Sequence, residues 1–330
     1  MEEDLRKAYG CLAGVAIGDA MGAPTTLMTP DEISERYGYV EDFIEPPPDH
    51  PIHAGLKAGQ VTDDTELTIL VAESIIMSNG VDLNNYVKLL VEWALKRKIF
   101  ETNFAGPSTT RALQKILKGA DPRDTGKLGT TNGGAMKISP IGILDRRKLD
   151  QAIMDTYSIC LPTHGSNVAI SAASAISCAI AEAFDESASL ESIIGAAIYG
   201  ARKGFKLGFK IPSASVDKRI ELALKIVEGA ESTEEAVKLL YDYIGMGIEA
   251  NEAVPSVIGI VKASDGETMR AIKAAVNIGG DADTIASMVG ALCGALNGIE
   301  SFPENLVNKV QEVNNLNLRE IAEKLLEIKR

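Results

Sequence analysis

Residues 61–70, VTDDTELTIL, place two adjacent aspartates between two threonines, ahead of an apolar run. Aspartate in the first turn of a helix complements the helix dipole, and Thr62 is a suitable N-cap residue. That structural role accounts for one acid more easily than for the neighbouring pair, Asp63 and Asp64. The pair has a chemical explanation if a second group of oxygen ligands lies beside it in the fold.

A second segment, NIGGDADTIASMVGAL, repeats the pattern much later in the chain. Asp281 and Asp283 stand next to Thr284, and the apolar run that follows predicts a helix. Residues i and i+2 of a regular helix point about 200° apart, so these acids converge on one centre only at a helix end or a turn. The preceding Gly279 and Gly280 give the backbone the freedom for such a turn.

Together the two segments offer four carboxylates and two hydroxyls. Without a cation, four clustered carboxylates would repel one another and raise each other's pKa values. Oxygen donors with no histidine or cysteine among them suit Mg²⁺ or Mn²⁺ better than zinc. The alternative is that the two segments are independent helix caps, because aspartate is common at helix starts. The candidate ligand set is Thr62, Asp63, Asp64, Asp281, Asp283 and Thr284.

Apolar residues recur at three- and four-residue spacing through most of the chain, which predicts amphipathic helices. No segment alternates polar and apolar residues between hairpin turns, as strands would. We therefore predict an all-α fold, a multi-helix bundle made of one domain that spans residues 1–330. The clearest helical segments are residues 67–77, 86–99, 110–119, 168–184, 217–230, 232–244 and 318–330.

Glycine recurs every fourth residue in two segments that are predicted to be helical. One stripe runs through residues 10–22, and the other runs through Ala282, Ala286 and the glycines of residues 290–298. A glycine inside a helix costs roughly 1 kcal/mol relative to alanine, so such a stripe needs a packing reason. We predict two buried helices, possible partners of each other, whose backbones approach closely along these faces.

One long irregular stretch, EDFIEPPPDHPIHAGLKAGQ, ends just before the paired aspartates. Its proline run favours an extended conformation. Long ordered loops are often functional, so a flap over a site and a plain surface connection are both open. His50 and His53 lie in this stretch, and we expect loop histidines of this kind to be solvated.

Composition excludes one class of partner. At 330 residues, with 45 % hydrophobic and 24 % charged residues, the chain is typical of a globular protein with a substantial core. Its 33 Lys and Arg against 46 Asp and Glu give a formal charge of 33 − 46 = −13. Because no basic block stands out, we expect no nucleic-acid partner. An acidic surface would repel anionic substrates unless a metal intervenes.

The four cysteines are far apart and form no CxxC pair, which argues against a zinc site or a disulfide framework and for a cytoplasmic location. The acidic start, MEEDLRK, lacks the basic region of a signal peptide. Two uncharged segments, residues 156–181 and 284–299, are respectively too polar and too short to span a bilayer. We expect no membrane partner, and a monomer.

Five motifs resemble, in order, those of the ADP-ribosylglycohydrolase family. They are GCLAGVAIGDAMGAP, GQVTDDTEL, NGGAMKISPIGIL, THGSNVAISAA and NIGGDADTIASMVGALCGALNGIESFP. The resemblance covers nearly the whole chain, and the TDDT and GGDxDT motifs are specific in combination. It implies an all-α fold and a site for two Mg²⁺ or Mn²⁺ ions. The implied reaction is metal-dependent hydrolysis at the anomeric carbon of an ADP-linked ribose, on an ADP-ribosylated protein or a small ADP-ribose conjugate.

The resemblance also implies roles for individual residues. The six candidate ligands named above become the metal ligands, and Asp63 or Asp283 becomes the carboxylate that orients the attacking water. His164 and Asn167 fall in the motif that borders the nucleotide pocket, although His164 taken alone is typical of a hydrogen-bonded core histidine. The implied substrate-binding residues are Asn132, Gly133, Gly134, Ala135, His164, Asn167, Gly279 and Gly280.

One position departs from the family pattern. Many members carry glutamate two residues beyond GAP, where this chain has Thr26. The missing acid suggests that arginine-linked ADP-ribose is a poor substrate. Two other functions stay open, a catalytically silent ADP-ribose-binding module and a hydrolase of another ribosyl or nucleoside-like glycoside. Four acids of the long loop are possible substitutes for the glutamate: Glu41, Asp42, Glu45 and Asp49.

Overall fold

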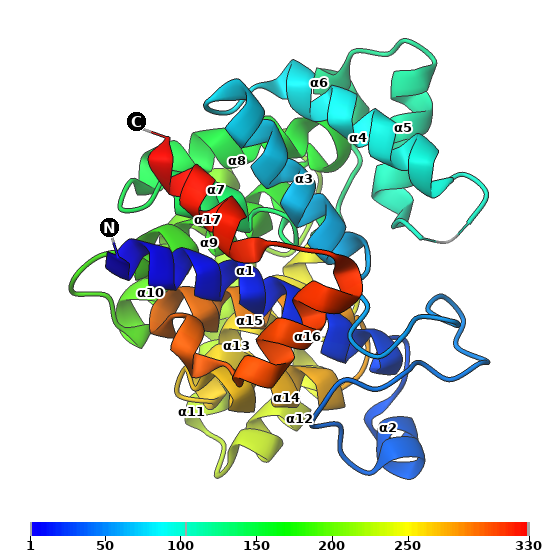
Figure 1. Cartoon of the computed structure of the whole chain (residues 1–330). Helices are drawn as coiled ribbons and strands as arrows, with labels where there is room; N and C mark the ends of the chain where they lie inside the picture. Colours follow the sequence, from blue (N-terminus) through cyan, green and yellow to red (C-terminus); the bar gives the residue numbers. More distant parts are fainter. Residues whose placement is uncertain (1, 103, 329–330) are drawn as a thin grey trace.

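The computed structural model describes residues 2–102 and 104–328. Within these residues the chain forms helices and no strand, and only two isolated β-bridges occur, Thr131 with Glu249 and Ser166 with Phe209. The helices pack into a single compact domain around one hydrophobic core, as Figure 1 shows. The predicted all-α fold is therefore confirmed.

Seventeen α-helices are described, separated mostly by short turns. The first half of the chain contains α1 (Glu2–Gly22), α2 (Pro30–Tyr37), α3 (Asp63–Ser78), α4 (Leu83–Arg97), α5 (Pro107–Leu117), α6 (Pro122–Thr125), α7 (Ser139–Leu144) and α8 (Leu149–His164). The second half contains α9 (Asn167–Ala183), α10 (Leu190–Gly204), α11 (Val216–Glu228), α12 (Thr233–Tyr243), α13 (Ala250–Ala263), α14 (Thr268–Asn277), α15 (Ala282–Asn297), α16 (Glu304–Asn314) and α17 (Leu318–Glu327).

The two glycine stripes pack against each other at the centre of the fold. A Cβ atom added at Gly14 would overlap the carbonyl of Gly290, and one added at Gly294 would overlap the carbonyl of Gly10. Gly18 meets the backbone of Ala286 in the same way. Helices α1 and α15 lie side by side in Figure 1, and glycine is what allows their backbones to come this close. The predicted pairing is confirmed.

The last glycine of the second stripe lies beyond the end of α15. Gly298 lies just beyond α15 as its C-cap, with φ +82°, and its neighbour is the guanidinium of Arg6. Its role is to end the helix, because this region of φ favours glycine. A Cβ atom added at Gly10 of α1 would also overlap the backbone of Gly298, so Gly298 continues the contact face from just beyond the helix.

Helix α9 is buried along almost its whole length and packs against α8 and α10. Its alanines and serines leave little bulk, and the hydroxyl of Ser171 donates to the carbonyl of Ala201 in α10.

Among the described helices, none alone has the length and hydropathy to cross a bilayer. One pair passes the same test together: α1 with its extension to Thr25, and α2, which is sharply bent against it.

Two helix starts carry the acidic motifs. Thr62 is the N-cap of α3 and accepts a hydrogen bond from the backbone N–H of Asp64. Asp281 is the residue before the first turn of α15, directly after two glycines with positive φ. Between α2 and α3 the chain runs without a helix, as the proline run predicted. In Figure 1 this loop and α5 project from the same side of the helical body.

Candidate active site

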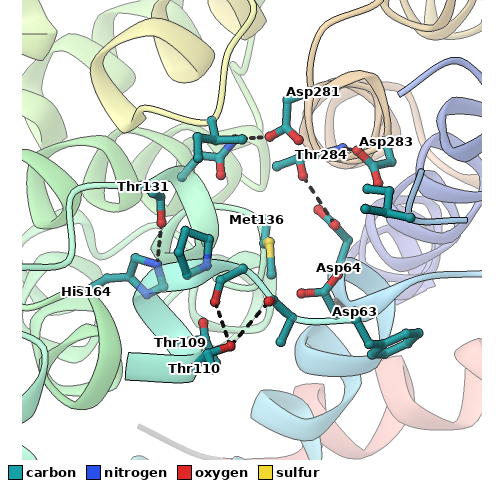
Figure 2. A pocket seen from close by; sticks show the side chains of 18 of the residues that line it. Asp63, Asp64, Thr109, Thr110, Thr131, Met136, His164, Asp281, Asp283 and Thr284 are labelled. Atoms are coloured by element: carbon teal, nitrogen blue, oxygen red, sulfur yellow. Dashed lines mark hydrogen bonds between the residues drawn. The ribbon is translucent and has the colours of Figure 1, made fainter. Parts of the chain in front are cut away.

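The two acidic motifs meet in one pocket. The pocket has a volume of about 520 Å³, which is suited to a small-molecule ligand. The hydroxyl of Thr284 donates to Oδ2 of Asp64 at 3.3 Å, so residues more than two hundred positions apart touch directly. Figure 2 shows this contact between the start of α15 and the start of α3. Five of the six candidate ligands line the pocket: Asp63, Asp64, Asp281, Asp283 and Thr284.

The backbone before α15 is shaped by its glycine pair. Gly279 has φ +75° and Gly280 has φ +68°, and an added Cβ would overlap the carbonyl of Met28 or of Met246. The predicted turn is present, and these glycines act by fitting between backbone segments. Neither glycine lines the pocket, so their predicted contact with substrate has no support from the geometry.

The start of α3 is held by an aspartate that sequence reasoning missed. Asp19, in the glycine-rich face of α1, is fully buried and accepts from both the N–H and the hydroxyl of Thr62. It also accepts from the N–H and the hydroxyl of Thr65. Thr62 therefore faces Asp19 and Asp64 and lies outside the pocket lining. The available signal for Asp19 was a single acid in the otherwise uncharged segment 8–22 of α1.

Burial and mutual repulsion raise the pKa values of most of these acids. Burial raises the pKa of Asp63 to about 8, with the charges of Asp283 and Asp19 adding to the shift. Burial, followed by the charge of Asp283, raises the pKa of Asp281 to about 7. The pKa of Asp64 is raised by burial and then by Asp19. Each shift is the penalty for a buried anion without a compensating cation.

Asp283 differs from the other three acids because a histidine neutralises it. Burial pushes its pKa upward, but the hydrogen bond and the charge of His53 outweigh burial and lower the pKa below its ordinary value. His53 Nε2 lies 2.8 Å from Oδ2 of Asp283. Burial lowers the pKa of His53, and the contact with Asp283 more than reverses that shift, so the pKa of His53 is raised.

The long loop is a flap with both of its histidines buried. His50 accepts from the N–H of His53 at Nδ1, and its Nε2 contacts the carbonyl of Thr26 at 2.9 Å. The two imidazole rings stack with centroids 5.2 Å apart. The expectation that these histidines are solvated was wrong, because the loop folds back over the start of α15. Ile52 and His53 line the pocket, which supports the flap interpretation.

The donor set fits a hard divalent cation. Oδ1 of Asp64 is buried and has no hydrogen-bond partner among the described residues. An orphaned buried carboxylate oxygen among acids whose pKa values are mostly raised by burial is where a cation would be stabilising. Among the described residues, however, no three His, Cys, Asp or Glu side chains are already gathered closely enough to hold an ion. The two-metal site remains a prediction, and side chains must shift to form it.

The NGG turn and His164 form another wall of the pocket. The amide of Asn132 donates to Asp281 at 2.5 Å, and an added Cβ on Gly133 would overlap the imidazole of His164. His164 contacts Thr131 at Nε2 and Thr163 at Nδ1. Burial, aided by nearby positive charge, lowers its pKa well below the ordinary value, so the ring is neutral. His164 is thus both a hydrogen-bonded buried histidine and a pocket residue.

Besides Gly279 and Gly280, three more predicted substrate-binding residues lie outside the pocket lining. Gly134 and Ala135 are buried behind Gly133, and the N–H of Ala135 donates to the carbonyl of Asn132 to close the turn. Oδ1 of Asn167 accepts from the N–H of Ile211. These residues shape the wall from behind, and direct contact with substrate has no support from the geometry.

The departure at position 26 also has a structural role. Thr26 is buried and outside the pocket lining, and its hydroxyl accepts from the N–H of Asp283 at 3.0 Å. The four loop acids named as substitutes lie elsewhere. Glu41 pairs with Lys273 and Asp49 with Arg36 on the surface, and Asp42 and Glu45 are exposed. Among the described loop residues, His53 is the titratable group that reaches the acids.

Helix α5 supplies a wall that the sequence did not reveal. Thr109, Thr110 and Arg111 line the pocket, and Phe104 lies just before this helix. The helix starts at Gly106 and Pro107 without a side-chain cap. Figure 2 places Thr109 and Thr110 across the pocket from Asp281. The signal in the sequence was only an ordinary helix start, which gives no hint of what it faces.

Comparison with known proteins agrees with this architecture. The family model described as ADP-ribosylglycohydrolase matches residues 1–330. YegU of Escherichia coli (strain K12) is 33 % identical over 318 residues, 96 % of this chain and 95 % of the relative. ADP-ribosylhydrolase ARH3 of Bos taurus is 26 % identical over 332 residues, 91 % of this chain and 87 % of the relative.

A solved structure, named an ADP-ribosylglycohydrolase-related protein complex, has the same fold. The TM-score is 0.73 with 20 % sequence identity, and the match covers 100 % of both chains. The family match spans the whole chain, and it coincides with the pocket in which the TDDT and GGDxDT motifs meet. The chain belongs to the ADP-ribosylglycohydrolase family.

Proposed function

We propose that the protein hydrolyses the glycosidic bond between ADP-ribose and a protein side chain or small acceptor, and that hydrolysis depends on two Mg²⁺ or Mn²⁺ ions. The observation that carries this proposal is the contact of Thr284 with Asp64, which joins both acidic motifs in one pocket. The family match supports a hydrolase of ADP-ribose conjugates. The names of the relatives leave the acceptor and the metal open.

The residues that would hold the ions are the five ligands that line the pocket. Their donors are oxygens, which suit hard divalent cations. When bound, such ions neutralise the acids, bind ribose hydroxyls and lower the pKa of water. Thr62 is proposed to act with them by holding the backbone and the carboxylate of Asp64, since its hydroxyl contacts both.

We propose Asp63 as the residue that orients the attacking water. Among the described residues, Asp64, Asp281 and Asp283 each accept a hydrogen bond at their carboxylates, whereas none is shown at the carboxylate of Asp63. Asp63 is half-buried and lines the pocket, so its lone pairs are accessible from the cavity. A general base needs such an accessible lone pair within reach of water. Asp283, held by His53, is the better-fixed ligand.

The opposite wall is proposed to bind the nucleotide part of the substrate. Neutral His164, the amide of Asn132 and the hydroxyls of α5 provide hydrogen-bond partners, and Arg111 is the cation among the described lining residues. Phe104 offers a flat face for a base. A cationic and hydroxyl-rich wall suits a diphosphate in an otherwise acidic protein.

Hydrolysis is tested by incubating the protein with arginine-, serine- and small-molecule-linked ADP-ribose, with Mg²⁺, with Mn²⁺ and with EDTA. We expect free ADP-ribose only when metal is present. Asp63→Asn and Asp283→Asn should each abolish release and metal-dependent thermal stabilisation. Asp31→Asn is the control, because Asp31 is exposed on α2 away from the pocket.

The outcomes separate the alternatives. If both Asn variants keep full metal-dependent stabilisation, the two motifs do not share a metal site. If metal and ADP-ribose bind but no conjugate releases ADP-ribose, the protein is a binding module. If the protein cleaves only other ribosides, it is a hydrolase of another ribosyl or nucleoside-like glycoside.

A further inference from the structure

Three exposed aliphatic side chains surround the mouth of this acidic pocket. Leu27, Ile52 and Ile248 all line it, with 55 %, 38 % and 40 % of their surface exposed. Single exposed aliphatic residues are common on protein surfaces and need no explanation. Here three of them line one cavity that also holds four carboxylates. We call these three residues the apolar collar.

Two members of the apolar collar are fixed to Asp283. Ile52 immediately precedes His53, whose imidazole contacts the carboxylate of Asp283. Leu27 immediately follows Thr26, whose hydroxyl accepts from the N–H of Asp283. Leu27 and Ile52 are therefore each next in sequence to a residue that contacts Asp283.

The third member is fixed to Asp281. The carbonyl of Ile248 accepts from the N–H of Asn132 at 2.8 Å, and the side chain of Asn132 donates to Asp281. The N–H of Leu27 donates to the carbonyl of Gly280, next to Asp281. Backbone hydrogen bonds thus hold Leu27 and Ile248 near the start of α15, and the contact of His53 with Asp283 holds Ile52 there.

Leu27 occupies a backbone conformation that leucine rarely adopts. Its φ is +64°, in the left-handed region where glycine or asparagine is usual. A non-glycine residue in this region costs on the order of 1 kcal/mol or more. Leucine gains only part of its burial energy here, since over half of its surface is exposed. Strain retained at an exposed apolar residue at the pocket mouth points to a ligand contact.

The two ends of the pocket differ in chemistry. The α5 wall, across from Asp281 in Figure 2, carries hydroxyls and Arg111 beside Phe104 and Pro107. The collar end carries aliphatic groups and His53. Among the described lining residues the only carboxylates are the four aspartates of the two motifs, so no acid is left over to pair with a cationic group on the substrate.

We propose that the apolar collar binds the leaving group and selects a neutral acceptor with apolar surface next to the glycosidic bond. The inference rests on the proposed hydrolysis. In that reaction water forms the new bond to the anomeric carbon, the bond to the acceptor breaks, and the acceptor leaves with a proton as an alcohol. An alkyl group beside the leaving oxygen would bury surface against the collar.

An arginine acceptor fits this surface poorly. Its ribosylated guanidinium is cationic, and moving a cation from water onto an aliphatic surface without a partner acid is costly. With ions bound, the four aspartates are engaged and cannot serve as that partner. Discrimination against arginine therefore comes from the collar and not from position 26.

The test uses a panel of ADP-ribose conjugates that share the nucleotide and differ in acceptor: methanol, butanol and arginine. We expect the unmodified protein to show a higher kcat/KM for the butyl than for the methyl conjugate. The expected ratio is about fourfold for each methylene that the collar covers, from ~0.8 kcal/mol per buried CH₂. The arginine conjugate should be the slowest.

Leu27→Asn removes the apolar surface and suits the left-handed backbone, so the variant should fold. The butyl-to-methyl ratio should fall toward one in this variant. Leu95→Asn is the matched control, because Leu95 is 57 % exposed on α4, outside the pocket lining. Its ratio should equal that of the unmodified protein.

The outcomes distinguish the two proposals. Three results would overturn the role of the collar and leave the proposed hydrolysis intact. They are equal kcat/KM values for the methyl and butyl conjugates, an unchanged butyl-to-methyl ratio in Leu27→Asn, and cleavage of the arginine conjugate as fast as that of the alkyl conjugates. If no conjugate is cleaved, the proposed hydrolysis is wrong. Calorimetric titration with the same conjugates then tests the collar as a binding surface. Tighter binding of the butyl than of the methyl conjugate, with the difference lost in Leu27→Asn, supports the collar. Equal affinities for the two conjugates reject it.

Discussion

His53, in the loop between α2 and α3, contacts Asp283, in the first turn of α15, through a hydrogen bond of 2.8 Å. The contact couples the flap to the acid cluster, and it lowers the pKa of Asp283 while burial raises the pKa of Asp63. Groups that orient a metal ligand in this way tune metal affinity without touching the ion. We therefore regard His53 as a positioning residue.

Replacing His53 should weaken metal binding. His53→Ala removes the partner of Asp283, and loss of such a partner typically costs 10- to 100-fold in metal affinity. His53→Gln retains an N–H that can reach the carboxylate, so it should recover part of the affinity. Calorimetric titration with Mn²⁺ measures both variants. Equal affinities in all three proteins would contradict a positioning role.

Two glycine-to-alanine substitutions should have opposite effects on stability. Gly14→Ala drives a methyl group into the carbonyl of Gly290, and overpacking of this kind typically costs ~1–3 kcal/mol or more. Gly195 lies in the middle of α10 with nothing within 4 Å of an added Cβ. Gly195→Ala should therefore raise the free energy of unfolding by roughly 0.5–1 kcal/mol. Denaturant unfolding measures both, and a neutral Gly14→Ala would argue against the close contact.

The glycine stripes show what the sequence can reveal. Helix periodicity and four-residue spacing are local properties, so the helices and the α1–α15 contact face were predictable. The four aspartates were found because they repeat one pattern twice. Asp19 and His53 act through contacts between distant segments, and the sequence does not show which segments meet. Asn167 sits inside a recognisable motif, yet its amide holds a neighbouring loop.

Buried Lys137 is another residue whose surroundings the sequence does not show, and it gives a pH-dependent prediction. Its ammonium group is fully buried and donates to Thr163, and burial lowers its pKa from 10.5 to about 8. The unfolded chain therefore binds more protons between pH 8 and 10.5, so this group's contribution to stability rises with pH in that window. Below pH 8 the buried ammonium group lowers the free energy of unfolding by its full amount, on the order of 3 kcal/mol.

Lys137→Met should remove that penalty. At pH 7 and in EDTA, the variant should be more stable by ~1–3 kcal/mol, and its advantage should shrink as the pH approaches 10.5. Lys7→Met is the control, because Lys7 is also buried but donates to the carbonyl of Ala183 at 2.7 Å and lies near Glu3. That variant should gain nothing. A pH-independent difference for Lys137→Met would contradict the lowered pKa.

Thr26 gives the last prediction, because the fold uses its hydroxyl group. The N–H of Asp283 is one of the donors at the start of α15 that no helical carbonyl accepts, and Thr26 satisfies it at 3.0 Å. Thr26→Val keeps the shape but leaves that buried donor unpaired, which should lower the free energy of unfolding by ~1–3 kcal/mol. Thr26→Ser keeps the hydroxyl and should lose much less. Thr26→Glu would place another buried carboxylate behind Asp283, outside the pocket lining, so it should reduce stability and give no gain with arginine-linked ADP-ribose. Urea unfolding compares the three variants, and product release compares the last with the unmodified protein. Brisk cleavage of the arginine conjugate by Thr26→Glu would show instead that position 26 faces the substrate.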